Sequence, residues 1–501
     1  DYFRKKIRAP FLSPLAAQFE FRTERPTQVK VRSRDREKVL AAIEQELENH
    51  HLYLSNYLTH PLYGEERQVG FCRGDTLRPM ALRETSPGVY QFRVWGIAVG
   101  RSDLPRFLRG PNQDGPPAPD MPAPPPGAHR IFITMPADPN ARGVDSTEWY
   151  DFQPRKWPRR HPKNPLRPPI PLLLCRREKG ETLAPHYDRL YADGVVRIAF
   201  LFGFDEGSHL TTQDARDIWR ILTAPPGRRF TARHTGKYGY HGAGLGFSDP
   251  IGGDFEKLNM DGTSVFRRDS ISGEGPVAVR YRLESGPLKI GGARAPAESI
   301  QIDGRPARDG EILPAGALIE RALAVEIRLY NFDKSSDGRS SEDLIRQFVS
   351  VFSDNDLVHY DGHANYGGGF FVGDQPDDIL WAQFIGDHRR YFSRDYQIFS
   401  IGACHAAGYF ADLFYNELRP RKSPRNLDII AAVNEAAFED AVQQGLELVS
   451  SLLQLKGSAG GEARDYASML LALSRPASFQ AYLGVFGHPR RKGAVAHAIG
   501  K

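Results

Sequence analysis

Cysteine is scarce in this chain of 501 residues, which contains only Cys72, Cys175 and Cys404. Three cysteines allow at most one disulfide bond, so the chain is not a disulfide-stapled scaffold, and their number does not identify a redox compartment. No pair has the CxxC spacing of a structural zinc site. We therefore predict a protein that requires no metal and no other cofactor.

Long apolar runs are absent as well. No stretch approaches the roughly 18 apolar residues of a membrane-spanning helix, so the sequence predicts a soluble protein without a transmembrane segment. Lys and Arg number 66 against 61 Asp and Glu, and the net charge of +5 does not by itself predict nucleic-acid binding. The first residue is Asp1 rather than Met, which suggests a processed product and leaves the localisation unknown.

The composition is that of a folded protein, with 40% hydrophobic and 11% aromatic residues, and the chain is too long for one ordinary core. We expect residues 1–130 to form an N-terminal α+β region that ends in a proline-rich linker, with one or two helices within 35–58 and a strand at 88–100. Residues 131–320 are predicted to form a β-rich accessory domain. Residues 321–501 are predicted to form an α/β domain.

A basic, proline-rich arm occupies residues 154–169. Its cations are Arg155, Lys156, Arg159, Arg160, Lys163 and Arg167. Such a strip suits an anionic partner or a proteolytic cleavage site, and 419–425 (RPRKSPR) is a second candidate for cleavage. We favour the other interpretation, an ordered arm that lies over the protein's own acidic surface.

Strand and helix patterns alternate in the last domain. The sequence predicts strands at 324–332, 356–360, 397–402 and 427–433, and helices at 341–352, 405–418 and 434–455. This alternation predicts right-handed crossovers and a mostly parallel sheet that is flanked by helices.

Two of these predicted strands end at a reactive side chain. His363 follows the first, in 356-DLVHYDGHANYGGGFF-371, and Cys404 follows the second, in 396-YQIFSIGACHAAGYF-410. Because the carboxyl ends of parallel strands share one edge of a sheet, the two side chains are expected to meet there. A nucleophilic thiol needs a neighbouring base, so the pair predicts a Cys–His dyad for acyl transfer.

The residues around the pair fit that chemistry. If a helix begins near His405, its positive end favours the thiolate form of Cys404. The backbone N–H groups of Cys404 and Ala364 are candidate donors to an oxyanion. Cys72 and Cys175 adjoin apolar residues, which is typical of buried, inert thiols.

These two segments resemble motifs of the clan CD cysteine peptidases, the superfamily of caspases, legumains, gingipains, clostripain and separases. HYDGHANYG (359–367) is similar to the "GHG" motif of gingipain-like and separase-like members, with Ala364 replacing the second glycine. FSIGAC (399–404) resembles their strand-plus-cysteine block. The resemblance covers residues 324–455. It implies a caspase/haemoglobinase fold, Cys404 as nucleophile and His363 as general base and acid.

The resemblance also implies a peptide or protein substrate and strict specificity for the residue before the scissile bond. The large N-terminal region and the basic, proline-rich loops of such a protease suit a zymogen that is regulated by proteolysis. The candidates for an acidic substrate pocket are Asp333, Asp361, Asp395 and Glu435. A carboxylate there would select Arg or Lys, although each of the four also suits an ordinary turn or helix start.

Two other functions compete with this interpretation. The domain suits a catalytically degenerate, caspase-like scaffold that binds partners without hydrolysis. His359, His363, Cys404 and His405 also invite a metal-binding interpretation, but His359 and His363 share a face only if the strand continues through Gly362, which we do not expect.

Overall fold

The computed structural model describes the parts of the chain that carry the fold. These are residues 11–12, 16–59, 69–71, 77–101, 121–138, 157–176, 183–204, 210–231, 241–249, 263–268, 277–283, 287–292, 297–331, 341–365, 369–372, 379–404, 406–432, 436, 438–455, 463–474 and 483–486. The chain forms two compact units, residues 1–181 with 491–501 and residues 182–490. The division therefore falls at 181/182 rather than at the expected boundaries near 130 and 320.

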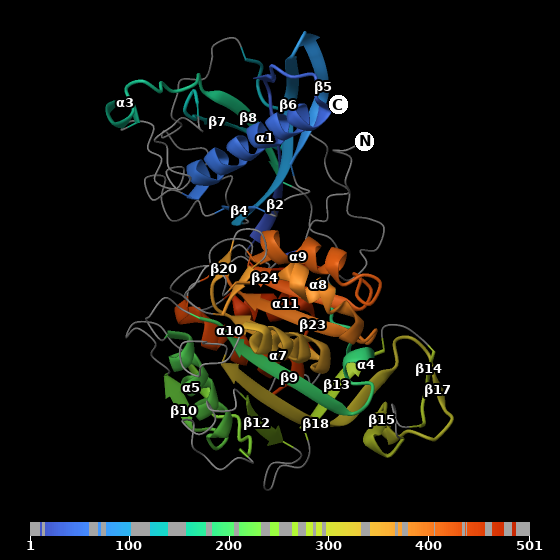
Figure 1. Ribbon diagram of the computed structural model, residues 1–501. Helices are drawn as coiled ribbons and strands as arrows, with labels where there is room; N and C mark the ends of the chain where they lie inside the picture. Colours follow the sequence, from blue (N-terminus) through green and yellow to red (C-terminus); the bar gives the residue numbers. More distant parts are fainter. Residues whose placement is uncertain are drawn as a thin grey trace. The chain divides into compact units, whose positions relative to one another are not determined.

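The N-terminal unit is built on an antiparallel sheet (Figure 1). Its elements are β1 (Phe11–Leu12), β2 (Ala16–Thr23), β3 (Thr27–Lys30), α1 (Arg36–Thr59), β4 (Val69–Phe71), β5 (Arg78–Ser86), β6 (Val89–Arg101), β7 (Ala128–Ile133), α3 (Trp157–Arg160) and β8 (Ile170–Arg176). The strand order is β3-β6-β2-β8-β7, and β4 and β5 also pair with β6. Because β7 and β8 belong to the same sheet as β2, the expected boundary near residue 130 would cut through one domain.

Helix α1 covers one face of this sheet. It is a single helix over almost the whole predicted range 35–58. Its buried side chains Ile43, Leu47 and Leu54 share a core with Phe19 and Phe21 of β2, as the helical spacing of the apolar residues requires.

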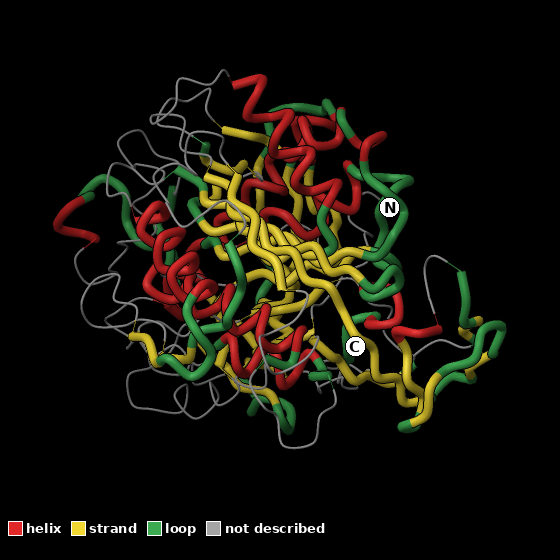
Figure 2. The backbone as a smooth tube through the Cα atoms, turned by 90° about the horizontal axis from the view of Figure 1, so that it is seen from below, coloured by secondary structure: helices red, strands yellow, loops and turns green. Residues whose placement is uncertain are grey.

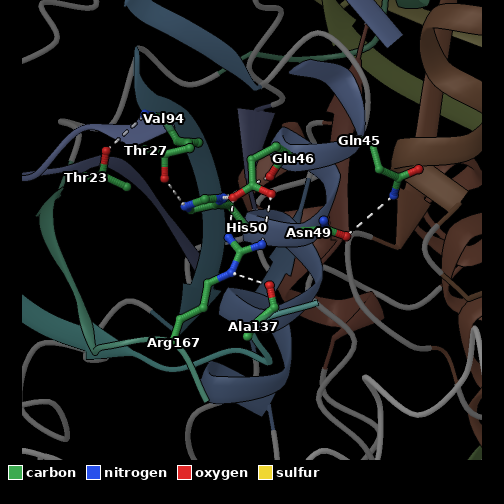
Figure 3. A network of polar contacts seen from close by, with 9 residues as sticks. All are labelled: Thr23, Thr27, Gln45, Glu46, Asn49, His50, Val94, Ala137 and Arg167. Carbon is green, nitrogen blue, oxygen red and sulfur yellow. Dashed lines mark hydrogen bonds and ion pairs between the residues drawn. The ribbon is translucent and has the colours of Figure 1, made fainter. Parts of the chain in front are cut away.

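A buried polar network joins α1 to the basic arm (Figure 3). The Arg167 guanidinium forms an ion pair with Glu46, and Nδ1 of His50 lies 2.8 Å from the Glu46 carbonyl oxygen. Nε2 of His50 lies 3.1 Å from Oγ1 of Thr27. Burial lowers the pKa of His50. The described part of the arm begins at Trp157, which is buried, and Arg167 of the arm pairs with the acidic Glu46 of the same unit. Arg155 and Lys156 lie outside the described residues.

The C-terminal unit contains the central parallel sheet. Its strands are β9 (Val195–Phe202), β10 (Arg229–Thr231), β11 (His241–Ala243), β12 (Thr263–Arg268), β13 (Val277–Arg282), β14 (Leu288–Lys289), β15 (Ile300–Ile302), β16 (Arg305–Pro306), β17 (Ile312–Leu313), β18 (Leu318–Asn331), β19 (Leu357–Asp361), β20 (Ala364–Asn365), β21 (Gly369–Phe371), β22 (Ile379–Trp381), β23 (Gln397–Gly402), β24 (Leu427–Ala432) and β25 (Leu483–Phe486). The helices are α4 (Tyr187–Leu190), α5 (Leu210–Thr223), α7 (Ser341–Asp354), α8 (Ala382–Asp387), α9 (Ala406–Glu417), α10 (Phe438–Leu453) and α11 (Tyr466–Leu473).

The strand order of this sheet is β18-β9-β19-β23-β24-β25. The first five strands are mutually parallel, and β25 is antiparallel to β24. The prediction of parallel strands flanked by helices is confirmed for these five strands, whereas β12, β13, β15, β16 and β25 of the same sheet pair in antiparallel fashion. However, β9 lies within the segment expected to be an accessory domain, so the α/β fold begins well before residue 321. Strands β12, β13 and β15 extend the sheet by antiparallel pairing with β18.

Helices lie on both faces of the sheet (Figure 2). Phe348 and Phe352 of α7 pack with Phe399 of β23 and Phe414 of α9 on one face. Helix α10 lies on the other face, in contact with α5, α11 and β19. All residues of β19 and β24 are buried, as expected for strands covered on both sides. No helix in the described residues is long and apolar enough to cross a membrane.

Candidate active site

The two reactive residues directly follow the carboxyl ends of two neighbouring strands, at equivalent positions in the register of the sheet. Strands β19 and β23 are parallel, and Asp361 pairs with Gly402 at their carboxyl ends. His363 and Cys404 each follow that pair by two residues. Neighbouring strands lie about 4.8 Å apart. The sheet register therefore brings the imidazole-bearing and thiol-bearing segments to adjacent positions on one edge.

Tyr360 of β19 holds the turn that carries His363 in place. The Tyr360 hydroxyl donates a hydrogen bond of 2.7 Å to the His363 carbonyl oxygen. A Cβ atom at Gly362 would lie 2.6 Å from that hydroxyl oxygen, so this close approach requires glycine. The Gly203 N–H donates to the Asp361 carbonyl oxygen at 2.8 Å. The turn is thus held to β9 as well as to its own strand.

The imidazole of His363 is half-buried and packs edge-on against Phe371, with ring centroids 6.0 Å apart. Ala364 follows as the first residue of β20, which pairs with β21 through Ala364 and Phe370. The candidate oxyanion donor Ala364 therefore lies at the edge of a small three-stranded sheet, β20-β21-β22.

Cys404 is half-buried between β23 and α9, whose first residue is Ala406. Its Sγ lies 3.5 Å from both the backbone nitrogen and the carbonyl oxygen of Ala436. An N–H that donates to sulfur stabilises the thiolate, and a carbonyl accepts the proton of the neutral thiol. Together with the N-terminus of α9, which favours negative charge, this contact suits a sulfur that changes its protonation state. No pattern in the sequence indicated the contact with Ala436.

The four pocket candidates are not all brought together. Asp361 is buried at the end of β19, next to the turn of His363. Asp395 is exposed and precedes β23, so the length of that strand, about 20 Å, separates it from Cys404. This corrects the expectation that Asp395 lies at the reactive edge. Asp333 and Glu435 lie outside the described residues, as does His405.

A second buried carboxylate lies near this edge and was not predicted. Thr211 of α5 donates a hydrogen bond of 2.7 Å to the carbonyl oxygen of Gly203, directly after β9. Asp214, one helical turn further along α5, is completely buried. The only signal in the sequence is a pair of polar residues on the apolar face of an amphipathic helix, and that pattern alone does not indicate a site.

His359 lies inside the sheet rather than at the edge. Its side chain is 2% exposed, Nδ1 lies 3.0 Å from Oγ of Ser400, and Nε2 has no hydrogen-bond partner among the residues that the structure describes. Burial lowers the pKa of His359 to about 4. It therefore does not join His363 beyond the strand end. Among the described residues no three His, Cys, Asp or Glu side chains are grouped so that they could hold a metal ion.

The buried His359 predicts a pH-dependent stability. Its pKa is about 4 in the folded protein and about 6.5 in the unfolded chain, so between these values protons bind preferentially to the unfolded state. His359 therefore stabilises the fold above pH 6.5, and this contribution is lost as the pH falls towards 4. We expect the wild type to lose about 2 kcal/mol between pH 7 and pH 5 relative to His359→Asn.

Urea unfolding of both proteins at the two pH values measures this difference. Ser400→Ala is the matched control, because it removes the hydrogen-bond partner but leaves the histidine buried, and it should keep the wild-type pH dependence. Equal pH dependence in the wild type and His359→Asn would contradict the prediction.

Comparisons of the chain with protein-family models, with curated proteins and with solved structures found no match.

Proposed function

We propose that this protein is a cysteine endopeptidase of the clan CD type, with Cys404 as nucleophile and His363 as general base and acid. The observation that carries the proposal is the pairing of Asp361 with Gly402, because this register sets both residues at one edge, at the same level. Geometry that brings a thiol and an imidazole together is the first requirement of such a dyad.

The chemistry follows from the groups at this edge. The Cys404 thiolate attacks the carbonyl carbon of the scissile bond, and the N–H groups of Cys404 and Ala364 donate to the oxygen that becomes negative. His363, protonated by the thiol, gives that proton to the leaving amine as the C–N bond breaks. It then takes a proton from water, which attacks the thioester and releases the acid and the free thiol.

The fold supports this proposal. The resemblance implies a mostly parallel sheet covered by helices on both faces, and residues 182–490 contain five mutually parallel strands in a mixed sheet that packs against helices. The further assignment to the caspase/haemoglobinase fold is part of the proposal. Regulation by cleavage is proposed with it, at the exposed arginines of α3 or at the exposed Arg419 and Arg425.

Asp361 supports a basic residue before the scissile bond. Its carboxylate lies at the end of β19 and precedes His363 by two residues, and a desolvated Arg–carboxylate pair discriminates strongly between substrates. We expect kcat/KM for peptides with Arg or Lys at this position to exceed that for Asp or Asn by at least about 10²-fold. A library of fluorogenic peptides that differ only in this residue measures the preference.

Asp361→Asn should remove most of this preference, whereas the control Asp395→Asn, at the opposite edge, should leave it unchanged. A preference for Asp or Asn would discard the acidic pocket but keep the peptidase. If no peptide is cleaved and an activated-ketone inhibitor does not label Cys404, the degenerate scaffold is correct. Stoichiometric zinc in the purified protein would favour the metal-binding alternative.

A further inference from the structure

Two arginine-rich loops lie side by side at the amino edge of the parallel sheet, opposite the reactive edge. They are residues 388–394, before β23, and 418–426, between α9 and β24. Nδ2 of Asn426 donates hydrogen bonds of 2.9 Å to the carbonyl oxygens of both Arg394 and Arg421. Nζ of Lys422 donates to the Asp395 carbonyl oxygen at 2.7 Å. Asn426 and Lys422 thus tie the second loop to the end of the first, and we call the surface formed by their arginines the arginine face.

The arginine face has a local excess of positive charge that the net charge of the whole chain does not indicate. Its members are Arg389, Arg390, Arg394, Arg419, Arg421 and Arg425. All but Arg421 are exposed, and Arg421 is half-buried. In the described part of the chain none of the six forms an ion pair. The carboxylates in and next to the two loops are fewer, namely Asp387, Asp395 and Glu417. Asp356, which precedes β19, is a fourth carboxylate, and it interacts electrostatically with Lys422 of the second loop. The six arginines therefore outnumber these four carboxylates.

An exposed aromatic side chain lies within this charge. Tyr391 is 55% exposed. The Arg390 guanidinium lies over its ring, 4.8 Å from the centroid, and donates to the Tyr391 hydroxyl at 2.7 Å. The ring of His388 stacks with Tyr391 at a centroid distance of 6.2 Å. An aromatic ring that is exposed at the surface, as that of Tyr391 is, is suited to stacking with a nucleobase.

We infer that the arginine face binds single-stranded nucleic acid. Guanidinium groups bind phosphate oxygens in bidentate geometry. The arginines are spread over two adjacent loops, so they can contact successive phosphates of a nucleic-acid strand that crosses this surface. Tyr391 adds a contact that an acidic peptide or an anionic membrane surface does not need. Stacking also requires unpaired bases, which favours single strands over a duplex. The balanced totals of 66 basic and 61 acidic residues conceal this local excess.

Fluorescence anisotropy of a labelled oligothymidylate of about 20 nucleotides tests the inference on the full-length protein. We expect binding whose affinity falls with salt, with a slope of log K against log salt of about −0.7 for each phosphate contacted. The triple variant Arg390→Ser, Arg394→Ser and Arg421→Ser should bind at least about 10²-fold more weakly and with a shallower slope. Tyr391→Leu should bind about tenfold more weakly with an unchanged slope.

The matched control replaces three cations elsewhere, Arg159→Ser, Arg160→Ser and Lys163→Ser, and should keep the wild-type affinity. Unchanged thermal unfolding midpoints show that the variants are folded. Absence of binding at low salt, or equal binding by the triple variant, would overturn the inference. So would vesicles rich in phosphatidylserine, or a poly-glutamate peptide, that bind as tightly as the oligonucleotide and are insensitive to Tyr391→Leu.

Discussion

Replacing Cys404 with alanine is expected to abolish peptide hydrolysis and to leave the fold intact. The side chain provides the atom that becomes bonded to the substrate, so no other group substitutes for it, and the rate should fall by at least about 10⁴-fold. Removing one sulfur atom from a half-buried position next to Ala436 leaves little empty volume. The thermal unfolding midpoint should therefore change by only a few degrees.

Cys175→Ala is the matched control. Its thiol is buried in the N-terminal unit, and burial raises its pKa, so it is not a competent nucleophile. This variant should keep the wild-type kcat/KM. Substantial hydrolysis by Cys404→Ala, with Cys72 and Cys175 present, would remove the nucleophile from the proposal. Loss of activity only in Cys175→Ala would place the site in the other unit.

Local patterns in the sequence determined the elements around the site, but they did not determine how the sheet is assembled. Strand β23 spans the predicted residues 397–402, and α7 and α9 agree with their predicted ranges to within two residues. In each, the apolar spacing and the flanking turn residues are local signals. Strand β9 was missed as a member of the parallel sheet, because its partners β18 and β19 lie more than a hundred residues away, and pairing over that distance has no local signal.

The same distinction applies to the residues of the site. His363 and Cys404 were predicted because each ends an apolar run in a segment of small residues. The support that Tyr360 gives the His363 turn, and the contact of Ala436 with Cys404, depend on how separate segments pack. Asp395 was misplaced for a related reason. Proximity to a strand end in the sequence does not specify which edge of the sheet the residue occupies, and Asp395 precedes its strand.

Replacing His363 with alanine should cost a similar amount of activity, at least about 10³-fold in kcat/KM, because the thiol then lacks both its base and the acid for the leaving amine. The double variant His363→Ala, Cys404→Ala should be no slower than Cys404→Ala alone, since nucleophile and base act as one unit and their effects are not additive. Steady-state hydrolysis of the preferred peptide measures all three proteins.

His405→Ala is the matched comparison, because His405 adjoins the nucleophile in the sequence but precedes α9 instead of ending a strand beside β23. Its effect should be at least tenfold smaller than that of His363→Ala. Labelling of Cys404 by a chloroacetamide across a pH range adds a second readout: if the imidazole shares a proton with the thiol, His363→Ala should shift the rise in labelling to higher pH. If His405 is essential and His363 dispensable, the general base is His405, and the assignment of His363 as the base is wrong.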